Sequence, residues 1–229
     1  MKNRFQDKFD FIIENIKDKI VLDIGCVEEM RDFSKLNMKK TQHYKLKQYT
    51  KRLVGIDLEK EGVESLNAIG CECYVSFAEN VVKLNLGKFD VILIGDIIEH
   101  IPDPSLFLKS IRENLTDDGI IICTTPNIYG YHFTYSLLLK KPITRLQHVA
   151  GYCWVTLSNL FRLSGYDVVL YKYGVFWKNP KNKLRPFFEK IIFSVNEEFA
   201  PHLLFIAKKN LHFNEVKQKE LQEQRIFTK

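Results

Sequence analysis

The sequence predicts an α/β fold built on a doubly wound, mostly parallel sheet. Short apolar runs alternate with amphipathic helical segments along most of the chain, which is the pattern of such a sheet. The run 21–26 ends in a glycine turn, and the run 53–57 ends in the carboxylate of Asp57. Ligands of open α/β sheets bind beyond such strand ends, so the two runs predict a nucleotide-like cofactor site.

The amino-terminal part supplies the first two strands. Apolar residues at helical spacing predict an amphipathic helix over residues 5–16, before the first strand. That strand ends at Gly25 and is followed by a long charged segment, 27–52, with a helical piece at 41–49. The second strand ends at Asp57, where a carboxylate can accept two hydrogen bonds from a ribose diol.

The middle of the chain continues the alternation of helices and strands. The predicted helices are 61–68 and 103–114, and the predicted strands are 71–75, 89–96 and 120–124. The run 89–96 is apolar almost throughout, as expected for a strand that is covered on both faces. Pro104 suits the first turn of a helix, where its missing N–H is not needed.

The carboxy-terminal third mixes regular elements with insertions. Helices are predicted at 154–163 and 186–194, and strands at 166–173 and 199–208. We expect a single domain over 1–210, with insertions at about 128–150 and 174–198, followed by a polar tail at 211–229.

Composition narrows the function classes. The 229 residues are 45% hydrophobic with a net charge of +6, as in an ordinary soluble domain. The basic residues are scattered and mostly lysine, so no nucleic-acid partner is expected.

The five cysteines form no C-x-x-C pair, which predicts buried thiols and no metal. No signal core or membrane span is visible, and we expect a cytoplasmic protein.

Several segments together resemble one enzyme family. They are 21–26, 54–57, Ala78-Glu79, the run from Gly95 to Pro104, 115–119, 124–127, and Gln147-His148-Val149 followed by 154–165. They are similar to class I S-adenosylmethionine (SAM)-dependent methyltransferases, and most of all to the subgroup that includes ubiquinone-biosynthesis O-methyltransferases. The resemblance covers residues 21–173 and implies a Rossmann-like sheet of seven strands, with an antiparallel last strand and helices on both faces.

The resemblance also implies roles for particular residues. Asp23 and Gly25 would shape the turn near the methionine part of SAM, Asp57 would bind its ribose, and Glu79 would lie near the adenine, with Ala78 beside it. Asp96 and Ile97 would border the sulfonium, and the neighbouring Cys26 and Leu58 complete the predicted cofactor-binding set. His148 is the candidate general base, which would remove a proton from an acceptor hydroxyl.

One departure from the family pattern concerns the turn after the first strand. The family usually has glycines two and four residues after the first, where this chain has Val27 and Glu29. Glycine there lets the backbone approach a ligand closely. We interpret the change as variation within the family, and a catalytically inactive scaffold subunit is the alternative that it motivates.

The expected function is methylation of a small molecule, with a sugar, a glycan precursor or a related metabolite as the oxygen acceptor. An RNA methyltransferase and a nicotinamide-dependent oxidoreductase remain further alternatives. Phe187, Phe188, Ile191 and Ile192 lie among basic residues, which favours core packing or a homodimer contact and leaves open peripheral contact with a membrane surface.

Overall fold

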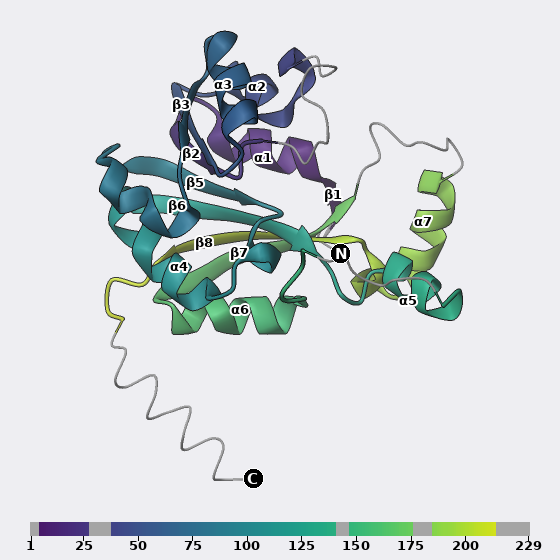
Figure 1. Cartoon of the computed structure of the whole chain (residues 1–229). Helices are drawn as coiled ribbons and strands as arrows, with labels where there is room; N and C mark the ends of the chain where they lie inside the picture. Colours follow the sequence, from purple (N-terminus) through teal and green to yellow (C-terminus); the bar gives the residue numbers. More distant parts are fainter. Residues whose placement is uncertain (1–4, 28–37, 141–146, 176–184, 214–229) are drawn as a thin grey trace.

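The computed structural model of the protein describes residues 5–27, 38–140, 147–175 and 185–213 (Figure 1). Its strands are β1 (Phe5–Asp7), β2 (Ile20–Ile24), β3 (Arg52–Asp57), β4 (Glu72–Val75), β5 (Phe89–Gly95), β6 (Leu115–Pro126), β7 (Tyr166–Val175) and β8 (His202–Lys209). They form one sheet in the order β1-β7-β8-β6-β5-β2-β3-β4. Only β8 runs antiparallel to its neighbours, β6 and β7, which confirms the mostly parallel sheet with an antiparallel last strand.

Helices cover both faces of this sheet. They are α1 (Lys8–Ile16), α2 (Gln42–Lys47), α3 (Lys60–Ala68), α4 (Pro104–Ser110), α5 (Tyr131–Leu138), α6 (Trp154–Leu163) and α7 (Arg185–Val195). Short 3-10 helices are η2 (Met38–Lys40), η3 (Ala78–Leu84), η4 (Ile98–His100), η5 (Ile111–Asn114) and η6 (Glu197–Phe199). Figure 1 shows α1, α2 and α3 on one face and α4 and α6 on the other, with α5 and α7 beyond the end of the sheet.

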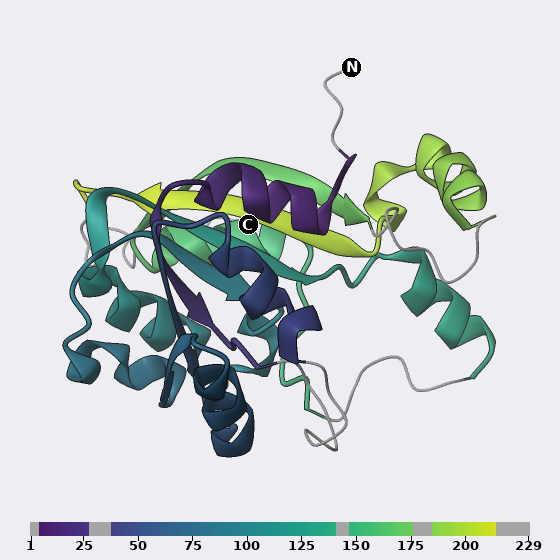
Figure 2. The same cartoon turned by 90° about the horizontal axis from the view of Figure 1, so that it is seen from above.

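Two apolar clusters hold these layers together. On one face, Phe11, Ile12 and Ile16 of α1 pack with Leu46 of α2 against buried residues of the central strands. On the other face, the larger cluster includes residues of α4 and α6 together with the opposite side chains of the same strands. The alternation of side chains between the two faces explains why the central strands are apolar almost throughout. Figure 2 shows α1 lying across the sheet from above.

The prediction of seven strands and of a helix from residue 5 is wrong at the amino terminus. The sheet has eight strands, because Phe5 to Asp7 pair in parallel with Tyr173 to Val175 at the edge of β7. Helix α1 begins only at Lys8, since the Asp7 side chain accepts hydrogen bonds from the N–H groups of Phe9 and Asp10 and so caps the helix. Helical spacing alone did not reveal this cap.

Some predicted features lie outside the described residues. They are Glu29, most of the tail at 211–229 and part of the insertion at 174–198. Within the described residues, no helix is long and apolar enough to cross a membrane.

Candidate cofactor and acceptor site

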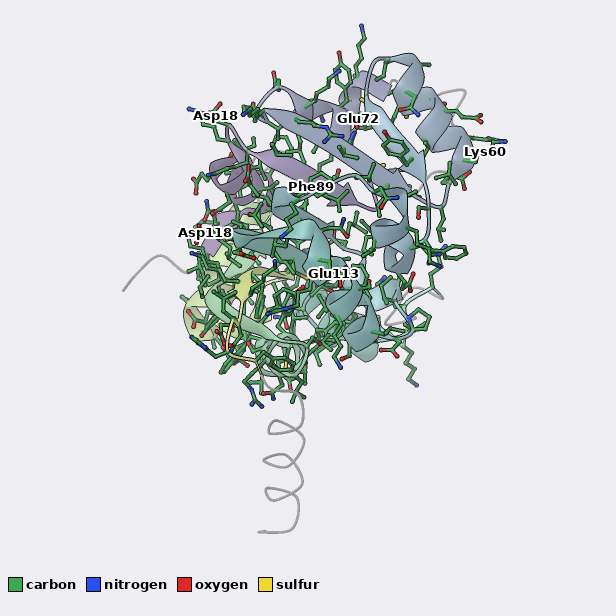
Figure 3. The ribbon with its side chains drawn as sticks, turned by 90° about the vertical axis from the view of Figure 1, so that its left-hand side faces the viewer. Asp18, Lys60, Glu72, Phe89, Glu113 and Asp118 are labelled. Carbon is green, nitrogen blue, oxygen red and sulfur yellow. The ribbon has the colours of Figure 1, made fainter. Side chains whose placement is uncertain are left out.

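The candidate site lies at the edge where the parallel strands end. Gly25 follows β2, Asp57 ends β3, Ser76 follows β4 and Asp96 follows β5. The opposite edge is seen in Figure 3, where Glu72 and Phe89 mark the starts of β4 and β5. The parallel pairing of β2 with β3 and β5 therefore brings together the strand ends that the sequence analysis singled out.

The turn after β2 contacts both neighbouring strand ends. Gly25 has a φ of 78°, in the left-handed region that favours glycine, and a Cβ at this position would collide with the side chain of Ile97. On the other side, the Val27 N–H donates a hydrogen bond of 2.9 Å to Asp57 Oδ2. The turn is thus wedged between Asp57 and Ile97, two of the predicted cofactor residues.

Asp57 also organises the segment after β3. Its Oδ1 accepts a hydrogen bond of 2.9 Å from the Glu59 N–H. Each carboxylate oxygen has a second lone pair, so the carboxylate can still accept bonds from a diol. The next residue, Leu58, is 57% exposed, and Ala78 and Glu79, at the start of η3, are half-buried. These three residues follow the ends of β3 and β4.

Asp96 lies at the centre of a group of charged and polar side chains. One of these side chains comes from α1, near the amino terminus. The Lys8 ammonium, at the start of α1, pairs with Asp96 Oδ2, and Thr124 donates a hydrogen bond of 3.0 Å to Oδ1. His202 Nδ1, at the start of β8, lies 3.7 Å from the same oxygen. Burial acts to raise the pKa of Asp96, but Lys8 and His202 outweigh it and hold the pKa well below its usual range.

The backbone of Asp96 is held in an uncommon conformation. Its φ is 54°, in the left-handed region that non-glycine residues visit rarely. Such conformations persist where surrounding contacts enforce them, often at functional sites. Here the Asp96 N–H donates to the Thr124 carbonyl, which ties the end of β5 to β6 while the side chain meets Lys8.

Glu99 lies buried beside this group. Only 2% of the residue is exposed, and its Oε2 accepts a hydrogen bond of 2.9 Å from Thr125 Oγ1. Burial, followed by the negative charge of Asp96, raises the pKa of Glu99 to about 7. Glu99 can therefore carry or release a proton near neutral pH.

Glu99 should make folding stability depend on pH. Its pKa is raised from 4.5 to about 7 on folding, so its protonated form is favoured in the native state. The contribution is fully present below about pH 4.5 and is lost as the pH rises to about 7, amounting to about 3 kcal/mol. Glu99→Gln, which mimics the protonated acid, should remove this loss. Urea unfolding of both proteins across this range measures the difference, and parallel curves would refute it.

A carboxylate and two imidazoles converge next to η4. Ligand atoms of Glu99, His100 and His148 all lie within 4.8 Å of one another, and the two imidazole rings meet edge to face with centroids 4.8 Å apart. The loop that carries His148 is held there because the Val149 N–H donates to the Glu99 carbonyl at 2.9 Å. These donors are of the kinds that bind zinc and similar cations. The prediction of no metal thus stays open at this position.

Asp23 and Cys26 point into the protein beneath the turn. Asp23 is 3% exposed, and its Oδ2 lies 2.7 Å from Nδ1 of the buried His43 in α2. Burial acts to lower the pKa of His43. The hydrogen bond to Asp23, followed by the one to Cys73, outweighs burial and raises this pKa to about 9. Cys26 is 3% exposed and packs with Cys73 and residues of α3. Both residues support the turn from below rather than line its outer edge.

Lys8, His43 and His202 were not singled out in the sequence. Each reaches the site from an element distant in the sequence, and none lies in a motif that marks it. Lys8 offered one weak signal, since it is a charged residue on the apolar side of a predicted helix. Glu99 and His100 lie within the segment of family resemblance, but only the fold shows that they meet His148.

A sheet of this order, with an antiparallel last strand and a glycine turn beside an acidic strand end, defines the class I SAM-dependent methyltransferases. A family model described as a methyltransferase domain matches residues 1–171, and the chain belongs to that family.

The curated relatives match over a shorter stretch. The ubiquinone biosynthesis O-methyltransferase of Cereibacter sphaeroides is 32% identical over 95 residues, which are 39% of this chain and 38% of the relative. The matched stretch is thus well under half the length of the relative.

Solved structures share the fold over most of the chain. A SAM-dependent methyltransferase from Archaeoglobus fulgidus has a TM-score of 0.59 at 16% identity, covering 88% of this chain and 91% of its own. The magnesium protoporphyrin IX methyltransferase of Synechocystis PCC 6803, solved with bound S-adenosylhomocysteine, has a TM-score of 0.56 at 11% identity, covering 88% and 81%. At these identities, the likeness shows the fold alone.

Proposed function

We propose that the protein transfers the methyl group of SAM to a hydroxyl oxygen of a small molecule, a sugar, glycan precursor or related metabolite. The observation that carries the proposal is the turn after β2, which contacts Asp57 on one side and Ile97 on the other. This geometry supports a cofactor lying across the ends of β2, β3 and β5. The C. sphaeroides relative is named an O-methyltransferase, which supports oxygen as the acceptor atom.

In this proposal, Asp57 binds the ribose, and Leu58, Ala78 and Glu79 surround the adenine. Asp23, Gly25 and Cys26 form and support the turn near the methionine part, and Asp96 and Ile97 border the sulfonium. Val27 replaces one of the glycines usual in the family, and its N–H is already bonded to Asp57. A glycine would donate the same backbone N–H, so the substitution leaves this bond in place, and the carboxylate keeps lone pairs for the ribose.

The acceptor would lie next to Glu99, His100 and His148. The sulfonium is already an activated methyl donor, so the protein must mainly align the acceptor oxygen in line with the methyl group and exclude water. A hydroxyl oxygen also has to lose its proton, and His148 is the proposed base. Its position beside Glu99, whose pKa is raised to about 7, offers a second group that can hold the proton.

Replacing Asp57 by alanine should weaken SAM binding by about 1–3 kcal/mol, or roughly fivefold to 150-fold. The variant would leave the ribose hydroxyls and the N–H groups of Val27 and Glu59 without their acceptor. Calorimetric titration with SAM measures the effect.

Asp118→Ala is the matched control, because Asp118 is an exposed carboxylate at the opposite edge of the sheet (Figure 3). It should bind SAM like the unaltered protein. Equal affinity of the Asp57→Ala variant and the control would mean that the cofactor site is misplaced. Thermal unfolding of both variants separates lost binding from a lost fold.

The acceptor class can be tested directly with SAM labelled in its methyl group. Panels of sugars, nucleotide-linked glycan precursors, phenolic metabolites and RNA should show label transfer to hydroxyl-bearing small molecules only. Transfer to RNA, with strong salt-dependent binding, would instead favour the nucleic-acid alternative.

A further inference from the structure

Two buried thiols meet beneath the cofactor turn, around a glycine. Cys26 follows Gly25, Cys73 lies in β4, and Gly55 lies between them in β3. A Cβ on Gly55 would lie 2.7 Å from Cys26 Sγ and 2.8 Å from Cys73 Sγ. The two sulfurs are therefore at most about 5.5 Å apart, which is the sum of these distances. Glycine at this position leaves the space in which they meet.

The backbone of the turn creates this meeting point. The N–H groups of Gly25 and Cys26 both donate to the Ile56 carbonyl, at 2.9 and 3.2 Å, so the chain crosses over β3 instead of continuing β2. Cys73 pairs directly with Gly55 in the sheet. A side chain from the turn and one from β4 thus converge over the same residue.

The Cys26 thiol and His43 stabilise the thiolate form of Cys73. The hydrogen bond from Cys26 is the largest influence on Cys73, and together with His43 it lowers the pKa of that thiol to about 6 against the effect of burial. His43 Nε2 lies 3.4 Å from Cys73 Sγ, while its Nδ1 is held at 2.7 Å by Asp23. The same interaction raises the pKa of Cys26, which stays protonated. The pair thus combines a thiolate with an adjacent thiol.

We propose that Cys26 and Cys73 form a redox-active dithiol, which hydroperoxides oxidise to a disulfide that changes the cofactor turn. The geometry carries the proposal. The sulfurs of Cys26 and Cys73 converge over Gly55, and the His43 imidazole contacts Cys73. The backbone of Cys26 is held in the turn by its hydrogen bond to the Ile56 carbonyl. The thiolate is the reactive form of cysteine, and it is stabilised here by His43 and the Cys26 thiol.

The chemistry balances with hydrogen peroxide as the oxidant. The Cys73 thiolate attacks one peroxide oxygen, the O–O bond breaks, and the departing hydroxide takes the proton of the His43 imidazolium to become water. Cys26 Sγ then attacks the resulting sulfenic acid, the S–S bond forms, and hydroxide leaves with the Cys26 proton as a second water. Two thiols are oxidised by two electrons, and one peroxide is reduced to two waters.

The consequence for SAM rests on the proposed function. Cys26 precedes Val27, whose N–H holds Asp57, so drawing the two sulfurs to a bonding distance of about 2 Å shifts this part of the turn. We expect oxidation to weaken SAM binding by about tenfold. By linkage, saturating SAM should make the dithiol harder to oxidise by the same factor, which is a shift of about 30 mV in its reduction potential.

The first test concerns the disulfide itself. The reduced full-length protein is treated with hydrogen peroxide, remaining thiols are alkylated, and peptides are mapped without reduction. The expected product links the peptides of Cys26 and Cys73. Cys71→Ser is the matched control, because Cys71 is the more exposed neighbour in the sequence, and this variant should still form the bond. A Cys71–Cys73 bond, or oxidation of Cys71 alone, would overturn the proposal.

The second test compares SAM affinity of the reduced, oxidised and re-reduced protein. Oxidised protein should bind about tenfold more weakly, and dithiothreitol should restore the affinity. Cys73→Ser should be insensitive to peroxide, and its thermal unfolding shows whether it is folded. If the reduced protein binds no SAM, the proposed function fails, whereas the peptide map still decides the disulfide. A mapped disulfide with unchanged SAM affinity would refute the regulatory part.

Discussion

Replacing His43 by leucine should lower the free energy of unfolding by about 3–5 kcal/mol. Its side chain is 1% exposed, and its partner Asp23 is 4% exposed. Leucine would leave a carboxylate in the core without the hydrogen bond of 2.7 Å that compensates its desolvation, and would also remove the neighbour of Cys73. Urea unfolding, with the slope checked for two-state behaviour, measures the loss.

Two variants control this experiment. His212→Leu changes an exposed histidine and should leave stability within about 0.5 kcal/mol. The double variant Asp23→Val and His43→Leu removes both members of the pair and should recover much of the loss, since no unpaired charge stays buried. A single His43→Leu variant as stable as the native protein would contradict the role given to this ion pair.

Replacing His148 by alanine should lower turnover by about a hundredfold to ten-thousandfold while SAM affinity stays unchanged. The reason is that His148 lies on the proposed acceptor side, next to Glu99 and His100. The rate is measured with labelled SAM and whichever acceptor the panel yields, and the affinity is measured by calorimetry.

The same assay distinguishes a base from a metal ligand. If His148 acts as a base, chelators should leave the native rate unchanged. Loss of activity with a chelator, restored by a divalent cation, would assign Glu99, His100 and His148 to a metal site instead. A His148→Ala variant with the native rate would exclude both roles. His132→Ala changes another histidine outside this group, and it should keep the native turnover.

The fold was largely predictable because its signals are local. Apolar runs such as 89–96 marked the central strands, and the order of strands and helices followed from their alternation. The eighth strand was not predictable, because β1 has only three residues and is a strand only through its pairing with β7. Asp7 was the residue that marked the boundary, as the cap of α1.

The candidate site was predictable only for residues that are marked by their own strand. Asp57 and Asp96 follow apolar strands, and this position alone places them at the carboxyl edge of the sheet. Lys8 reaches Asp96 across 88 residues of sequence, and His43 reaches Asp23 and Cys73 from a separate helix. Such contacts depend on which helix covers which strand, which no local spacing encodes.

Calorimetric titration of the reduced, full-length protein with SAM tests the central claim most directly. The turn after β2, held between Asp57 and Ile97, predicts saturable one-to-one binding that Asp57→Ala weakens and Asp118→Ala does not. No heat at high micromolar SAM, with the protein shown to be folded, would contradict the account and favour an inactive scaffold. Stabilisation by a nicotinamide cofactor in place of SAM would contradict it as well.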